Sequence, residues 1–159
     1  MFDRILYAAE IGDGHPRSLD YVKDIALTHD SEVIVLRVGE LTEEQLALAR
    51  KNAPDMDAAA EAKKTQARME GQMAGGEIAA ALNAAGVFAR TVTRSGRIAE
   101  EVLDAAEEAD AHLIVVGSAP RSVLGALLTG NVTDEIVRKS RLPVLVVPQD
   151  APQPPAGED

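Results

Sequence analysis

Short apolar runs alternate with longer helical segments along most of the chain, and this alternation constrains the possible folds most strongly. Two of the runs, HLIVV at 112–116 and VLVV at 144–147, are continuous, with no polar residues interleaved. Continuous runs are typical of strands buried on both faces, as in a parallel sheet covered by helices. The expected strands lie at 5–9, 32–38, 87–93, 112–116 and 144–147.

Helical patterns fill the intervals between these runs. The expected helices lie at 16–28, 41–50, 57–85, 98–109 and 131–140. The longest of them is rich in Ala and ends just before Gly86, which suits the left-handed position that closes many helices.

This alternation predicts an α/β fold, a doubly wound open five-stranded parallel sheet with helices on both faces, Rossmann-like. We expect the strand order 3-2-1-4-5. That order places the switch point between the first and fourth strands, so a ligand should meet the strand tips after Ala9 and Val116.

Composition limits the protein to one domain and excludes several kinds of chemistry. A chain of 159 residues fits one core, here expected over 1–148, and the acidic, Pro-rich end at 149–159 is expected to be disordered. With no Cys there is no disulfide, thiol nucleophile or thiolate metal site. We find neither an apolar run long enough for a membrane span nor a signal peptide, so we expect a cytoplasmic protein without a membrane partner.

The formal net charge is −10, with 26 acidic groups against 16 basic ones. Such a surface repels phosphates at long range, so nucleic acid is not an expected partner and an anionic ligand needs a strong local site. The three His residues are scattered along the chain, and no metal site is expected.

The segment from Gly117 to Thr133 (GSAPRSVLGALLTGNVT) is the part of the sequence that best suits a ligand. It leaves a buried strand, contains three glycines and enters a helix at Asn131, which is a favourable N-cap. The free N–H groups and positive dipole end of that helix suit a phosphate, with Arg121 as an added cation and Ser118 as a hydrogen-bond donor. The alternative is an ordinary connection between a strand and a well-capped helix.

The spacing within this segment follows a known nucleotide motif. The motif has a Gly, two residues, a second Gly, nine residues, a Gly followed by Ser or Thr, and then an apolar strand containing Pro-Val. The corresponding positions here are Gly117, Pro120, Gly130 and Asn131, with LPVLVV at 142–147. Together with ILYAAE, EVIVLRV and SGRIAEEVLDAAEEADAHLIVVGS, they make residues 2–148 resemble the universal stress protein family.

The resemblance implies a regulatory domain of the stress response that binds an adenine nucleotide and acts as a homodimer. The implied ligand is ATP or AMP, with Mg²⁺ if it is ATP, and hydrolysis would be slow at most because no general base is evident. The implied nucleotide contacts are Ala9, Glu10, Val38, Gly117, Gly130, Asn131, Val132 and Thr133. Ser118 and Arg121 are added to them from the chemistry of the loop itself. Family members pair through their last strand, so we expect a homodimer through the edge strand from Val144 to Val147. We also expect a downstream protein partner, which the sequence does not name.

Three residues depart from the family pattern. Pro120, which has no N–H, replaces the second Gly; Asn131 replaces Ser or Thr; and Glu10 replaces the Asp that usually ends the first strand. The alternative function is therefore a dimerising interaction module that has lost nucleotide binding and uses no cofactor.

Other nucleotide-binding and signalling motifs are absent from the sequence. It contains neither a G-x-x-x-x-G-K-[ST] phosphate loop nor a G-x-G-x-x-G after a strand. A phosphoacceptor receiver domain needs an Asp and a Lys where the third and fifth strands end, and Thr93-Arg94 and Pro148-Gln149 stand there. A third possible function, an enzyme that acts on a small acid or amine, is not supported by any set of residues in this sequence.

Overall fold

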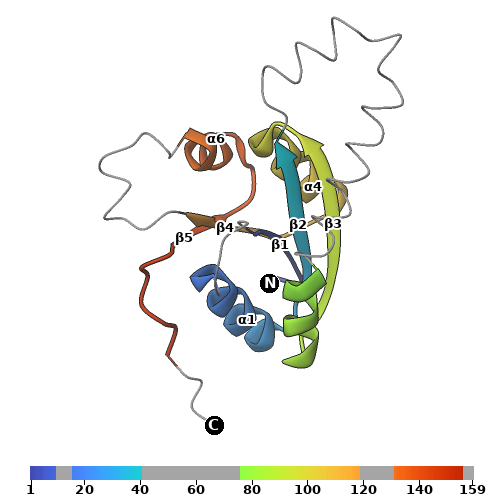
Figure 1. Ribbon diagram of the computed structural model, residues 1–159, viewed down its shortest axis with the longest axis vertical. Coiled ribbons are helices and arrows are strands. Elements are labelled where there is room, and N and C mark those ends of the chain that lie inside the picture. Colours follow the sequence, from blue (N-terminus) through green and yellow to red (C-terminus); the bar gives the residue numbers. More distant parts are fainter. Residues whose placement is uncertain (10–15, 41–75, 119–130, 156–159) are drawn as a thin grey trace, which may run out of the picture.

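Five parallel strands form one sheet in the order β3-β2-β1-β4-β5 (Figure 1). The computed structural model describes residues 1–9, 16–40, 76–118 and 131–155. The strands are β1 Arg4–Ala8, β2 Glu32–Glu40, β3 Phe88–Gly96, β4 Leu113–Ser118 and β5 Val144–Pro148. The expected fold class and strand order are confirmed.

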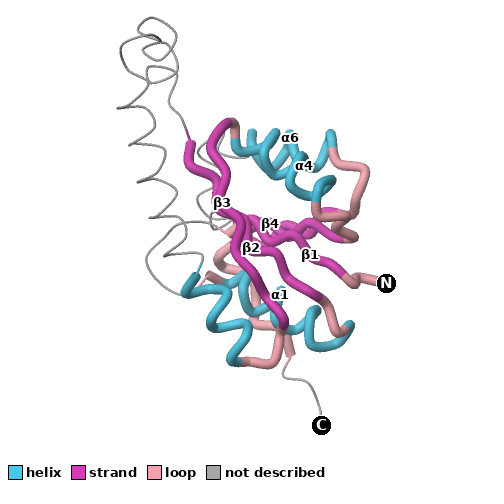
Figure 2. The backbone as a smooth tube through the Cα atoms, turned by 90° about the vertical axis from the view of Figure 1, so that its right-hand side faces the viewer, coloured by secondary structure: helices cyan, strands magenta, loops and turns pink. Residues whose placement is uncertain are grey.

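Helices cover both faces of this sheet (Figures 1 and 2). They are α1 Arg17–His29, α4 Ile98–Glu108, α6 Asn131–Lys139 and a helix over residues 76–84. On one face α1 and the helix at 76–84 pack against Ile5, Tyr7 and Val33. On the other face α4 and α6 pack against Leu6, Ile34 and Ile114. Successive strand residues point to opposite faces, so apolar side chains at consecutive positions supply both cores.

The strands β2 and β3 pair further along the chain than the apolar pattern predicts. Their register runs from Glu32 opposite Phe88 to Glu40 opposite Gly96, whereas the sequence predicts ends at Val38 and Thr93. The reason is that β3 is an edge strand, where polar side chains remain half exposed while the backbone continues to pair.

Gly86 closes the helix at 76–84, as the sequence predicts. Gly86 has φ 93°, and the N–H of Val87 donates to the carbonyl of Leu82 at 2.9 Å. This is the Schellman arrangement, in which a residue without Cβ adopts the left-handed conformation that closes the helix. The expected helix at 41–50 and the first part of the one at 57–85 lie outside the described residues.

The chain after β5 continues along α1. The Tyr21 hydroxyl donates to the carbonyl of Pro152 at 2.6 Å, and the N–H of Arg17 donates to Gln149 Oε1 at 3.1 Å. These contacts join Gln149 and Pro152 to α1 through donors that composition does not reveal. The expected disorder of the end at 149–159 stays a prediction. Residues 156–159 lie outside the described part, and the domain limit at 148 stays a prediction.

In the described part of the chain, no helix has both the length and the apolar content that crossing a membrane requires.

Candidate functional site

The carboxyl ends of β1 and β4 lie side by side in the middle of the sheet. Ala8 is opposite Val116 in the parallel register, so Ala9 and Gly117 follow next to each other. From this point the chain after β1 leads to α1 on one face, and the chain after β4 leads to α6 on the other. This is the switch point that the sequence predicts, and in open α/β sheets ligands bind at such a point.

Two contacts from β2 hold the backbone of Ala9. Its N–H donates to the carbonyl of Leu36 at 3.3 Å, and its own carbonyl accepts a hydrogen bond from Arg37 Nη1 at 2.8 Å. Val38 lies next along β2 and is half-buried against the core that α4 and α6 cover. The structure thus brings Ala9 and Val38, two of the predicted adenosine contacts, to neighbouring strand ends.

The helix α6 runs back against the strand direction, so it begins at the carboxyl edge. It connects β4, which ends at that edge, to β5, which starts at the opposite one. Val132 packs partly buried on the core and Ile136 is buried, which fixes the first turn of α6 against the sheet. Thr133 is half-buried, and the acidic Asp134 also lies in the first turn. Because the first N–H groups of a helix have no partner within it, this turn can hold an anion.

The structure begins α6 at Asn131, where the sequence predicts the helix to start, and ends it at Lys139, one residue before the expected end. Gly117 lies at the end of β4, half-buried, and the backbone of Ser118 closes that strand. Glu10, Arg121 and Gly130 lie outside the described residues, so their predicted roles stay predictions. The predicted roles of the Ser118 and Asn131 side chains stay predictions as well.

One residue at this edge was missed by the sequence analysis. Arg37 is only 2% exposed although it carries a charge, and burial lowers the pKa of its guanidinium, an effect that the nearby Tyr7 partly opposes. The signal was present in the strand EVIVLRV, where Arg37 continues the row of Val33 and Val35, both fully buried on the α1 face. A charge in a buried row is unusual and marks a position to inspect.

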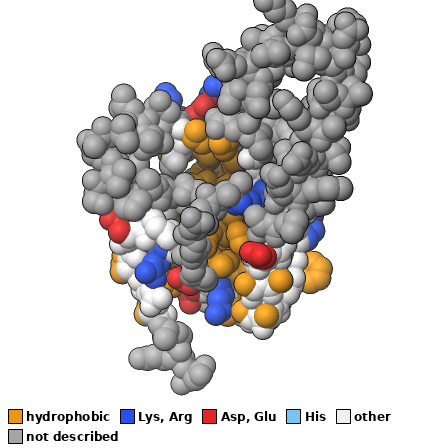
Figure 3. All heavy atoms as spheres, viewed as in Figure 1, with side chains coloured by type: hydrophobic (Ala, Val, Ile, Leu, Met, Phe, Trp, Pro, Cys, Tyr) orange, Lys and Arg blue, Asp and Glu red, His pale blue; other side chains and the backbone are white. Residues whose placement is uncertain are grey.

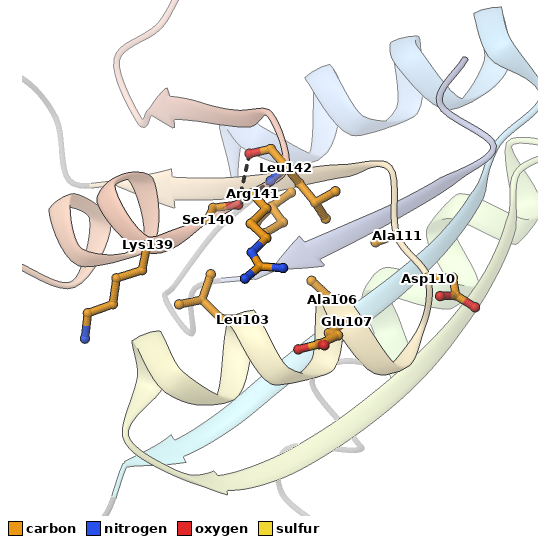
Figure 4. Close-up of a pocket in the computed structure, with 10 residues that line it drawn as sticks. Leu103, Ala106, Glu107, Asp110, Ala111, Lys139, Ser140, Arg141 and Leu142 are labelled. Carbon is orange, nitrogen blue, oxygen red and sulfur yellow. Dashed lines mark hydrogen bonds between the residues drawn. The ribbon is translucent and has the colours of Figure 1, made fainter.

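A hollow lies at the opposite, amino edge of the sheet, with a volume of about 430 Å³ (Figure 4). Its floor is apolar, with Leu103, Ala106 and Leu142, and Glu107 and Arg141 stand at its rim. The Ser140 hydroxyl donates to the carbonyl of Leu142 at 2.9 Å and accepts from its N–H at 3.0 Å, so it closes its own turn. The hollow has neither a free helix N-terminus nor a switch point, and the carboxyl edge is therefore the stronger candidate.

Charges of both signs are distributed over the face seen in Figure 3, around apolar side chains in its middle. Among the described side chains visible there, basic and acidic groups are interspersed. Across the part of the chain that the structure describes, no three His, Asp or Glu side chains come together as metal ligands.

The fold defines a class: doubly wound α/β domains in which the strand ends at the switch point lie at the same edge as a helix N-terminus. The sequence model of the universal stress protein family matches residues 1–148. The chain belongs to the universal stress protein family, which confirms the resemblance seen in the sequence.

Several relatives match along nearly their whole length. The universal stress protein YxiE of Bacillus subtilis is 30% identical over 151 residues, which cover 92% of this chain and 99% of that protein. The solved structure of MJ0577 from Methanocaldococcus jannaschii is 26% identical with a TM-score of 0.74, covering 96% of this chain and 99% of that one. A universal stress protein solved in complex with cAMP is 19% identical with a TM-score of 0.60, covering 94% and 98%, and supports the fold alone.

Proposed function

We propose that the protein binds an adenine nucleotide, AMP or Mg²⁺-ATP, at the carboxyl edge of the sheet and acts as a regulatory domain in a stress response. The observation that carries this proposal is the start of α6 at that edge, beside the ends of β1 and β4. A helix N-terminus at a switch point combines free N–H groups with a positive dipole end, which suits a phosphate. A family member with this fold was solved in complex with cAMP, and we extend its adenine base to this chain as part of the proposal.

In this proposal the nucleotide extends across the strand ends. The adenosine contacts Ala9, Glu10 and Val38, and the phosphates lie near Gly117, Ser118, Gly130 and the first turn of α6 from Asn131 to Thr133, with Arg121 adding charge. Adjacent strands are about 4.8 Å apart, so β2 and β4, with β1 between them, are about 10 Å apart. That separation matches the extent of an adenosine with its phosphate.

Calorimetry with AMP and with Mg²⁺-ATP tests the proposal. We expect a dissociation constant in the micromolar range, which corresponds to a binding free energy of roughly −8 kcal/mol. Asn131→Ala should weaken binding by removing a polar side chain at the helix start, whereas Asn131→Ser restores the residue type of the family motif and should strengthen it. If neither heat nor a thermal shift is measured at millimolar nucleotide, the proposal is wrong.

The second candidate function is a dimerising interaction module without a nucleotide. Two observations favour it: Pro120 removes an N–H from the motif, and β5 occupies one edge of the sheet with most of its apolar side chains half-buried. An apolar edge strand invites pairing with a second copy. We propose the homodimer through β5 under either function, so calorimetry, and not the oligomeric state, separates the two.

A further inference from the structure

Arg37 is a buried charge that none of the described carboxylates pairs with in an ion pair. It lies in β2, whose inward positions Val33 and Val35 are apolar, and an aliphatic residue would continue that row. Replacing a buried charge with an apolar residue of similar volume is often neutral or stabilising. The presence of Arg37 therefore calls for a reason other than the stability of the core.

The contacts of the guanidinium indicate what that reason is. Nη1 donates to the carbonyl of Ala9 at 2.8 Å, while Nε is buried without a hydrogen-bond partner. Thr93, opposite Arg37 in the parallel register of β2 and β3, also has a buried hydroxyl without a partner. The guanidinium thus has a buried Nε without a hydrogen-bond partner, and its described hydrogen bond is the one to Ala9.

The bond to Ala9 acts where β1 stops pairing. The last paired residue is Ala8, opposite Leu36 on β2 and Val116 on β4, and Ala9 is the first residue beyond that pairing. Strand ends that no longer pair are prone to fray. With its N–H on Leu36 and its carbonyl on Arg37, Ala9 is held on both sides of its backbone.

We propose that Arg37 is a positioning residue of the ligand site, which fixes the backbone of Ala9 so that the end of β1 presents a preformed surface to the adenosine. The inference rests on the proposed function, because the adenosine is placed at Ala9 by that function. Preorganisation of this kind strengthens binding because the protein orders less when the ligand arrives. The unpartnered Nε is the local penalty for this arrangement.

The test substitutes Arg37→Met, which keeps a long apolar stem and removes the donor. Two quantities are measured: hydrogen exchange of the Ala9 amide, and the affinity for AMP. We expect exchange at Ala9 to be faster by about tenfold or more and AMP affinity to fall by a similar factor, with a melting temperature equal to or above that of the wild type. A purely structural role would instead lower the melting temperature and leave exchange at Ala9 following global unfolding.

Two further variants complete the experiment. Arg37→Lys keeps a cation with a donor on a long stem and should restore part of the protection at Ala9. Thr93→Val is the matched control: it removes the other unpartnered polar atom at the same register position, and exchange at Ala9 and AMP affinity should stay as in the wild type.

The outcomes separate this inference from the proposed function. Wild-type exchange at Ala9 in both Arg37 variants overturns the positioning role, whatever the protein binds. If the wild type binds no nucleotide, the proposed function is wrong, and so is the role of Arg37 at a ligand site. Hydrogen exchange of the Ala9 amide then still shows whether Arg37 holds that backbone. Binding by the wild type with unchanged affinity in Arg37→Met overturns the inference alone.

Discussion

Pro120 is the residue that most directly opposes a phosphate in the motif of this chain. It replaces a Gly and has no N–H to donate. Pro120→Gly should restore that donor, and one hydrogen bond to a charged group contributes about 1.5–3 kcal/mol, so AMP affinity should rise by roughly tenfold or more. The same change at the exposed Pro155 serves as control and should leave affinity unaltered. Equal or weaker binding by the Pro120 variant would refute our interpretation of the loop.

Gly76 within a helix and Gly86 at its C-terminal turn give a prediction at the scale of elements. At Gly86, φ is 93° and no atom lies closer than 4.0 Å to an added Cβ, so Gly86→Ala introduces backbone strain without a clash. Unfolding in urea should show a loss of about 1 kcal/mol. Gly76 is helical, and an added Cβ meets nothing within 4 Å, so Gly76→Ala should gain up to about 1 kcal/mol. Shifts of the same sign in both variants would contradict this description of the helix end.

The elements also show which parts of the structure the sequence predicts well. Strand order and the two-sided core follow from apolar runs such as 112–116, because burial on both faces leaves few other sequences possible. The paired ends of β2 and β3 were missed because polar edge residues continue a ladder without any apolar signal. Arg37 was missed for a related reason: its role depends on the carbonyl of Ala9, a contact 28 residues away along the chain.

At the scale of the whole molecule, the open edge at β5 predicts a homodimer. Light scattering should give twice the mass of the 16.8 kDa chain at micromolar concentration. Along an edge strand, backbone groups point alternately toward the neighbouring strand and away from the sheet. The carbonyl of Pro143 accepts from the N–H of Ile114 and so points toward β4. Counting on in steps of two, Leu145 and Val147 also face β4, so the N–H of Val146 points away from the sheet. Val146→Pro should therefore yield monomers whose circular dichroism is unchanged. A wild-type monomer at that concentration would rule out the dimer.

The most direct test of the central claim is an NMR titration of the isotope-labelled protein with AMP. The account predicts that the shifted amides gather at the carboxyl edge, at Ala8, Ala9, Val38 and Gly117 and in the first turn of α6. Shifts gathered instead around Leu103 and Arg141 at the amino edge, or no shifts at millimolar AMP, would contradict it.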